Sequence, residues 1–211
     1  MTKNDNYVAV LGDVIASRRL APRARARLQD DLRDQVKEFN RRWRADLTGR
    51  FALTGGDQLQ CLLASPAPLW DVVHAVRHTF PEVDWIIACG RGALSTIPHP
   101  GATAPELDGP CFHAARAALD SAKAARRVFA VAGFGERADA FAAYYSALYW
   151  CWTPKQRRLV AELRWHAPRR AELYERLHVH PTAISHMKRR LAWPLVEAGD
   201  TMFRAVLQEA S

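Results

Sequence analysis

The sequence has few cysteines, and none of them form a closely spaced pair. Its 211 residues include four, Cys61, Cys89, Cys111 and Cys151, each far from the next. This spacing excludes the zinc and redox motifs that are built on Cys-X-X-Cys. Three of the four lie among apolar residues, so we expect small buried hydrophobic side chains and neither a disulfide framework nor a zinc site.

Long hydrophobic runs are also missing. No segment approaches the roughly 20 consecutive apolar residues that are needed to cross a bilayer. The N-terminal stretch MTKNDNYVAVLGD has an apolar run too short for a signal peptide and lacks a suitably placed small-residue cleavage site. We therefore expect a cytoplasmic protein with no membrane partner. A hydrophobic content of 49% is ordinary for a globular core.

Acidic residues are outnumbered by basic ones. The chain has 30 Lys and Arg against 22 Asp and Glu, a formal net charge of +8. Such an excess favours anionic partners, which include nucleic acids, nucleotides and membrane surfaces. The excess is concentrated between residues 154 and 193, where ten Lys or Arg stand against three Glu. This C-terminal segment is the first candidate for contact with nucleic acid.

The pattern of apolar residues predicts strands and helices in a mixed order. The elements in chain order are a strand over 7–11, a helix over 22–44, hairpin strands over 50–54 and 58–63, a helix over 69–80, a strand over 83–89, a helix over 112–125, a strand over 128–132 and a helix over 137–150. This order is typical of a split βαβ, or ferredoxin-like, sheet backed by helices, an α+β fold. Thr153-Pro154 then begins a helical segment. We expect one domain over 1–150 and a small all-α domain over 151–211.

Two acidic residues are brought together by this predicted topology. In a split βαβ sheet the first strand is central, and we expect it to lie antiparallel to the strand that enters the hairpin. Asp13, at the end of the first strand, would then meet Asp57 in the Gly55-Gly56-Asp57 turn. Two close carboxylates repel each other unless a hard cation such as Mg²⁺ lies between them. The alternative is structural: Asp13 caps a turn, and Asp57 closes the hairpin.

The residues that follow Asp13 suggest a phosphate site. The segment Val14-Ile15-Ala16-Ser17-Arg18 could turn its backbone N–H groups and the Ser17 hydroxyl towards phosphate oxygens. Mg²⁺ keeps several waters and needs only one or two carboxylates when the ligand supplies phosphates. Asp13 and Asp57 would therefore be enough for a Mg²⁺-bound nucleotide.

Three motifs, GDVIASR at 12–18, GGDQLQ at 55–60 and GPCFHAAR at 109–116, carry a family resemblance. The first two resemble the paired metal motifs of class III nucleotide cyclase and GGDEF palm domains, and all three together resemble the SatD family. The resemblance implies a palm-like nucleotide-binding sheet with Asp13 and Asp57 as Mg²⁺ ligands. The nucleotide-binding residues that it implies are Val14, Ile15, Ala16, Ser17, Arg18, Gly56, His113 and Arg116.

The sequence departs from the cyclase pattern in two places. Gln58 stands where GGDEF enzymes have a Glu, and an amide is not an anionic ligand. Phe112 stands four residues before Arg116, where the cyclases have an Asn, and His113 is the nearby polar residue. Both departures argue against ordinary cyclase chemistry, because phosphoryl transfer depends on accurately placed charge.

The basic C-terminal segment resembles a helix-turn-helix of the sigma-factor region 4 type. Helices are predicted over 154–165, 168–177 and 181–193, with His178-Val179-His180 as the turn. His178 replaces the usual turn glycine, and Tyr174 replaces a small alanine. Leu173, Leu177, Val179, Ile184 and Leu191 have the spacing that packs two helices across such a turn.

The resemblance assigns the third of these helices to the major groove of DNA. Thr182, Ser185, His186 and Arg189 would contact bases. The residues expected to hold phosphates are Lys188, Arg190, Arg169 and Arg170. The alternative is a helical cap whose charged face is solvated. The spacing of His178, His180 and His186 fits no zinc motif, and we expect His74 and His78 to lie on a solvated helix face.

An aromatic run lies at the predicted domain boundary. Tyr144, Tyr145, Tyr149, Trp150 and Trp152 most simply pack the two domains together, and a homodimer interface is the alternative.

The leading hypothesis is a regulatory protein that binds a Mg²⁺-bound nucleotide with one domain and DNA with the other. A Mg²⁺-dependent nucleotidyl transferase or cyclase-like enzyme with a nucleic-acid-binding tail, and a scaffold without either ligand, are the alternatives. No catalytic residue is assigned.

Overall fold

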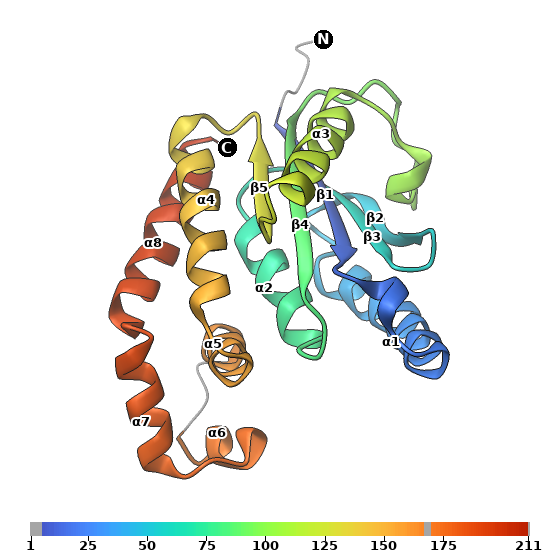
Figure 1. Cartoon of the computed structure of the whole chain (residues 1–211). Helices are drawn as coiled ribbons and strands as arrows, with labels where there is room; N and C mark the ends of the chain where they lie inside the picture. The colour runs from blue at the N-terminus through green and yellow to red at the C-terminus, as the bar shows by residue number, and fades with distance from the viewer. Residues whose placement is uncertain (1–5, 167–169, 211) are drawn as a thin grey trace.

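A five-stranded mixed sheet lies at the centre of the described part of the chain, residues 6–166 and 170–210 of a computed structural model. Its strands are β1 (Tyr7–Val14), β2 (Leu47–Thr54), β3 (Gln58–Leu63), β4 (Trp85–Gly92) and β5 (Phe129–Ala132). The order is β2-β3-β1-β4-β5, and only β4 and β5 are parallel neighbours (Figure 1). The fold is therefore α+β.

The central place of β1 agrees with the sequence prediction, but its neighbour differs. β1 pairs with β3, the strand that leaves the hairpin, and with β4. The expected neighbour was β2, the strand that enters the hairpin. A helical crossover leads from β1 to β2, so these two strands run in the same direction and β3 fits between them. Asp13 still lies opposite Gln58, directly after the hairpin turn.

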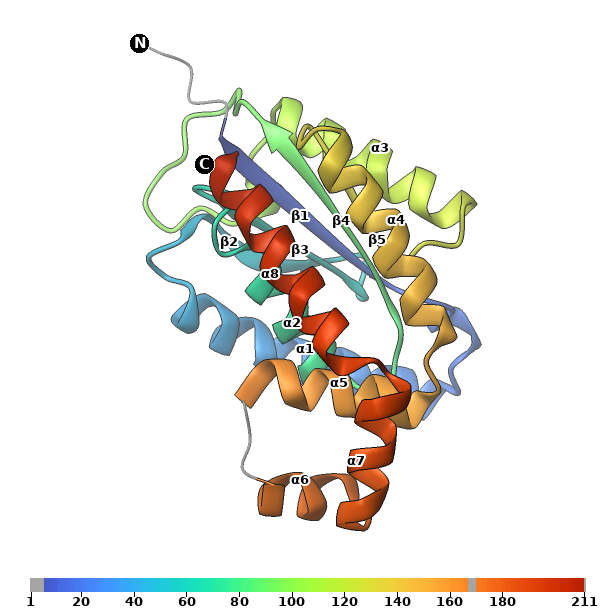
Figure 2. The same ribbon diagram turned by 90° about the vertical axis from the view of Figure 1, so that its left-hand side faces the viewer.

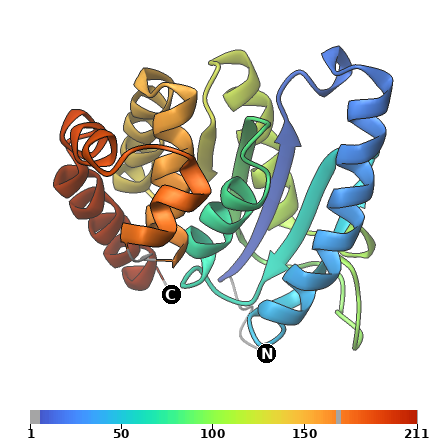
Figure 3. The ribbon, with the colours of Figure 1, turned by 90° about the horizontal axis from the view of Figure 1, so that it is seen from below.

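Helices cover both faces of the sheet. They are α1 (Pro22–Arg42), α2 (Leu69–Thr79), α3 (Pro110–Ala124), α4 (Glu136–Cys151), α5 (Pro154–His166), α6 (Arg170–Leu177), α7 (Pro181–Arg190) and α8 (Trp193–Glu209), with short 3₁₀ turns η1 (Ser17–Arg19) and η2 (Ala104–Glu106). One face packs on α3 and η2, and the other on α1, α2 and α4. Seen from below, α1 and α2 lie in front of the strands and α3 lies behind them (Figure 3).

The contact between α3 and β4 is unusually close. A Cβ atom on Gly90 would lie 2.2 Å from both the backbone nitrogen of Ala115 and the carbonyl oxygen of Cys111. The buried face of α3 is correspondingly small, because it consists mostly of alanine. The helix backbone can therefore rest almost directly on the sheet. The close contact fixes the position of α3 on the sheet, and with it the positions at which Arg116 and Lys123, outside the buried face of α3, approach the strands.

The C-terminal helices share a core with the sheet. α5 packs against α2, and α8 packs against α4 and α2. Arg164 of α5 forms two 2.7 Å hydrogen bonds with Asp200 of α8, which also accepts one of 3.1 Å from Trp70 Nε1. A domain boundary near residue 150 stays a prediction, and one buried cluster runs across it from Val8 to Leu207.

Two details of the chain correct the sequence reading. The helix expected over 181–193 ends at Arg190, and α8 begins separately after Ala192, whose φ of 48° breaks the helix.

Cys61, Cys89 and Cys111 are buried as predicted, whereas Cys151 is exposed. Burial raises the pKa of the Cys111 thiol to about 11. In the described residues, no helix combines the length and apolarity that crossing a membrane requires.

His74 and His78 do not lie on a solvated face, so that expectation was wrong. His74 is only 4% exposed and lies edge-on to Trp70, with ring centroids 4.3 Å apart. His78 Nε2 is 3.3 Å from Glu162 Oε1 on α5. The first contact lies within α2, whereas the second arises from the packing of α5 on α2, which the i, i+4 spacing of the two histidines does not reveal. Burial, followed by the charges of three nearby arginines, pushes the pKa of His74 well below 6.5.

Gly90→Ala should lower the free energy of unfolding by about 1–3 kcal/mol or more, because the new methyl group meets backbone atoms that cannot move aside. Gly199→Ala on α8 is the matched control. Its Cβ would meet only the Phe141 ring at 3.7 Å, so it should stabilise the protein by about 0.5–1 kcal/mol. Urea denaturation measures both, and equal effects of the two variants would contradict the close contact.

The free energy of unfolding should fall by about 1.4 kcal/mol between pH 7.5 and 5.5 because of His74. The unfolded chain binds a proton at this residue as the pH falls through about 6.5, whereas the folded protein, with its depressed pKa, does not. Denaturation at both pH values should show a smaller fall in His74→Gln. The exposed His113→Gln should retain the fall, and an equal reduction in both variants would refute the assignment.

Candidate functional site

The polar end of the sheet lies on the same face as α3. Alternation along β1 places Leu11 and Asp13 on this face. The register adds Gln58 opposite Asp13 and Gln60 opposite Leu11. Thr54 lies opposite Gln58 on the other side, so polar side chains from three neighbouring strands meet at one end of the sheet.

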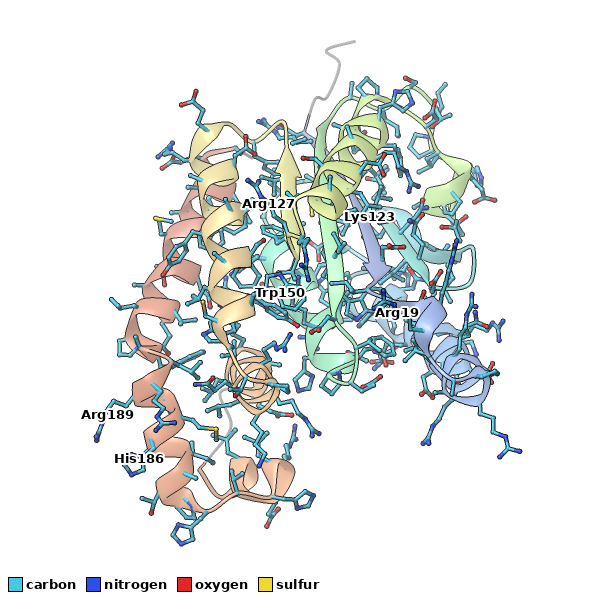
Figure 4. The ribbon with its side chains drawn as sticks, viewed as in Figure 1. Arg19, Lys123, Arg127, Trp150, His186 and Arg189 are labelled. Atoms are coloured by element: carbon cyan, nitrogen blue, oxygen red, sulfur yellow. The ribbon has the colours of Figure 1, made fainter. Side chains whose placement is uncertain are left out.

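Two cations of α3 reach this polar end. Lys123 Nζ lies 2.8 Å from Asp13 Oδ2, in an ion pair with side chains 43% and 22% exposed. Arg116 lies seven residues before Lys123, on the same face of α3. The Nη2 atom of Arg116 donates a 3.0 Å hydrogen bond to Gln58 Oε1. Lys123 and Arg19 lie on the same side of the sheet, the side that faces the viewer in Figure 4. The end of the sheet thus presents a carboxylate, that of Asp13, beside the positively charged side chains of Lys123 and Arg116.

Asp57 is tied to the turn that follows β1. The Ser17 hydroxyl donates a hydrogen bond to Asp57 Oδ2. Ser17 is buried, and the residue before it, Ala16, has a φ of 56°. The hairpin turn itself uses the positive φ of Gly55 and Gly56, at 61° and 91°. The two predicted motifs therefore meet in space through Ser17 and Asp57.

Gln58 is the centre of a hydrogen-bond network in which an uncharged amide accepts from a guanidinium and two neutral side chains. Its Oε1 accepts from Arg116 at 3.0 Å, Gln60 Nε2 at 3.1 Å and Thr54 Oγ1 at 3.3 Å. These residues line an open groove of about 480 Å³ together with Phe112. His113, also on this groove, is paired with Asp108 at 3.0 Å. The amide of Gln58 thus serves as an uncharged acceptor for the guanidinium.

The backbone N–H groups of residues 14–18, which the sequence predicts to bind phosphate, are only partly available. The N–H of Ile15 donates a 2.8 Å hydrogen bond to the carbonyl of Asp84, so it is not free for a phosphate. Val14 is buried within β1. Ser17 directs its hydroxyl to Asp57 instead. Arg18 is exposed at this end of the sheet and can reach an anion in solvent.

The donor set does not by itself complete a metal site. Within residues 6–166 and 170–210, no group of three or more His, Cys, Asp or Glu side chains is arranged to hold a metal ion. Asp13 is engaged by Lys123, and Asp57 by Ser17. Mg²⁺ could be held by these two carboxylates only together with phosphate oxygens and water.

The C-terminal helices show the packing expected across a helical turn. Leu173, Ile184 and Leu191 are buried, and Leu177 and Val179 pack against the same core. His178 has a φ of 49°, the left-handed conformation for which glycine is usual. The sequence predicted this turn.

The exposed face of α7 carries the residues proposed for DNA contact. Thr182, Ser185, His186, Arg189 and Arg190 are exposed, and Lys188, partly buried, lies 5.9 Å from the Trp193 ring centroid. His186 and Arg189 point away from the body of the protein (Figure 4). Arg169 and the side chain of Arg170 lie outside the described residues.

Sequence reasoning missed Lys123, Thr54 and Gln60. Lys123 lies seven residues after Arg116, so the helical period places both on one face, and this signal was available. The strand register that brings Thr54 and Gln60 beside Gln58 follows from the hairpin. What the sequence does not show is that an acid of β1 would be the partner of Lys123.

The family comparison agrees with the motifs that meet at this end of the sheet. The model of the SatD family matches residues 7–127, more than half of the chain. No curated protein matches the chain significantly. The chain therefore belongs to the SatD family.

Proposed function

We propose that this SatD family member is a regulatory protein that binds a Mg²⁺-bound nucleotide at the polar end of its sheet and DNA through α6 and α7. The observation that carries the proposal is a set of three contacts at one end of the sheet: Lys123 with Asp13, Ser17 with Asp57, and Arg116 with Gln58, the residue after Asp57. Carboxylates and cations in one open site suit a ligand that brings both phosphates and their counter-ion.

The strand order supports a palm-like reading of this site. The first four strands follow the order β2-β3-β1-β4 with antiparallel neighbours, which is the ferredoxin-like order. Asp13 and Asp57 would hold Mg²⁺ together with phosphate oxygens, and Arg116 and Lys123 would neutralise the remaining phosphate charge. When bound, the ion would screen the repulsion between the two carboxylates and the phosphates.

The same residues favour binding over turnover. Gln58 offers a neutral amide where an enzyme of this type needs a charged ligand, and its oxygen already accepts three hydrogen bonds. Lys123 occupies one oxygen of Asp13. Phosphoryl transfer needs charged side chains that stabilise the reacting phosphoryl group. Here Lys123 and Arg116 contact Asp13 and Gln58 of the protein instead.

The C-terminal helices support the DNA part of the proposal. α7 carries Lys188, Arg189 and Arg190 in its last turn and no acidic residue over Pro181–Arg190. Its exposed side chains face away from the sheet, and the left-handed His178 supplies the sharp turn of a helix-turn-helix. Lys188 and Arg190 would hold phosphates. The side chains that would approach base edges are Thr182, Ser185, His186 and Arg189.

The double variant Asp13→Asn, Asp57→Asn should bind nucleoside triphosphates at least about tenfold more weakly in the presence of Mg²⁺, because the two anionic ligands of the ion are lost. Calorimetry with a panel of triphosphates measures the affinity. The control Asp30→Asn, Asp34→Asn removes the same charge from exposed pairs on α1 and should bind like the wild type. Failure of the wild type to bind any triphosphate, or equal binding by the double variant, would refute the nucleotide site.

Arg189→Ala, Arg190→Ala should weaken binding to duplex DNA by about tenfold or more at low salt and should reduce the dependence of affinity on salt, because the base contact of Arg189 and the phosphate contact of Arg190 are both lost together with their charges. Gel retardation at several salt concentrations measures both quantities. Arg33→Ala, Lys37→Ala is the control, since it removes the same charge from α1. Equal loss in both double variants would show attraction by net charge alone. Substitutions on α7 are preferable to truncation near residue 150, which would remove the buried Phe203 and Leu207.

A further inference from the structure

A cavity of about 170 Å³ lies where α2, α4 and α5 meet, on the face of the sheet opposite α3. α5 crosses below α2 at this point (Figure 2). The wall of the cavity is formed by His74 and Arg77 of α2, Tyr145 and Tyr149 of α4, and Arg157 and Arg164 of α5. Arginines from α2 and α5 and aromatic rings from α4 therefore line one partly open cavity that the proposed function does not use.

Arg77 is the most unusual group in this wall. Its side chain is 8% exposed, and its two terminal nitrogens donate to the backbone carbonyls of Trp85 and Val128 at 3.2 and 2.5 Å. Its Nε has no hydrogen-bond partner, and no carboxylate lies within ion-pair distance of Arg77 in the described part of the chain. Buried arginines are normally paired with an anion. The positive charge of Arg77 is therefore left without a counter-ion.

His74 adds a second unsatisfied group one helical turn away. It is 4% exposed, and its Nε2 has no partner among the described residues. Burial holds the imidazole neutral, so it adds a hydrogen-bonding atom to the wall but no charge. A buried polar atom without a partner is energetically costly, so two of them on one wall favour a molecule that would pair with them.

The rest of the wall, next to Arg77, is aromatic and basic. The Arg77 guanidinium carbon lies 4.9 Å from the Tyr149 ring centroid and 5.8 Å from that of Tyr145. Arg157 lies 5.0 Å from the Tyr149 ring and is paired with Asp84 at 2.9 Å. These rings provide flat apolar surface next to the uncompensated charge.

The charges around the cavity are unequal. Four arginines, Arg77, Arg157, Arg158 and Arg164, line it against the acids Glu82 and Asp84. Asp200 neutralises Arg164 from behind, and Asp84 is shared by Arg157 and the Tyr149 hydroxyl. Within the described part of the chain, neither the buried Arg77 nor the exposed Arg158 has an ion-pair partner, and the arginines outnumber the acids Glu82, Asp84 and Asp200, so the cavity as a whole attracts an anion.

We infer that this cavity binds a small organic anion with a single planar ring, held by its carboxylate at Arg77 and by its ring against Tyr145 and Tyr149. A volume of about 170 Å³ is below that of pockets for drug-sized ligands, so the ligand is limited to one ring. A carboxylate matches the planar guanidinium, and a flat ring matches the tyrosine faces. The ligand would touch α2, α4 and α5 together and would link the sheet to the C-terminal helices.

Calorimetry with benzoate, nicotinate and salicylate, each against its uncharged amide, tests the inference on the full chain. At least one carboxylate should bind with one-to-one stoichiometry and about tenfold more tightly than its amide, because the amide lacks the charge that Arg77 requires. Inorganic phosphate should bind more weakly than that carboxylate, since it has no ring. Absence of binding by all three carboxylates, equal binding by an amide, or equal binding by phosphate would each overturn the inference.

Two variants locate the binding. Arg77→Met should abolish carboxylate binding, and circular dichroism would show whether it folds. Ala161→Phe on α5 fills the cavity without changing its charge and should abolish binding even if Arg77→Met does not fold. Arg189→Ala on α7 is the control and should bind like the wild type. Unchanged binding in Ala161→Phe would place the ligand elsewhere and refute the site.

Discussion

The backbone contact between α3 and β4 is the constraint on which the rest of the molecule depends. Gly90 has no side chain, and the buried face of α3 is largely alanine, so the helix position is set by backbone atoms that cannot rearrange. Lys123 and Arg116 reach Asp13 and Gln58 only because the helix lies so close. Partly exposed ion pairs contribute little to stability, so the apolar contact fixes the charges and not the reverse.

A second, smaller constraint joins the C-terminal helices to the sheet. Arg164 and Asp200 are nearly fully buried, and Asp200 also accepts from Trp70. Two buried charges are costly to desolvate and tolerate only a narrow geometry, so the pair selects one register of α8 against α2 and α5. The aromatic rings around it, among them Phe141 and Phe203 stacked at 4.3 Å, fill the remaining space. Specificity of packing comes from the polar pair, and the burial energy comes from the rings.

Much of this arrangement could be predicted from the sequence because it depends on local periodicity. The apolar run of β1, the turn at Gly55-Gly56 and the predicted central place of β1 were enough to place Asp13 beside the hairpin, even though the neighbouring strand was misassigned. The turn at His178 was predicted for the same reason. Contacts between distant helices were not predictable in this way. The contact of His78 depends on Glu162 of α5, more than 80 residues later in the chain, and no pattern within α2 reports it.

The break between α7 and α8 has a consequence for any partner of α7. Only Leu191 and Ala192 separate the two helices, Leu191 is buried, and α8 is held by Phe203 in the core (Figure 1). α7 is therefore a stiff extension of the core and not a segment on a flexible tether. A ligand that engages α7 meets a surface already ordered, so little conformational entropy is lost on association. The strain of one left-handed alanine is the thermodynamic cost of that preorganisation.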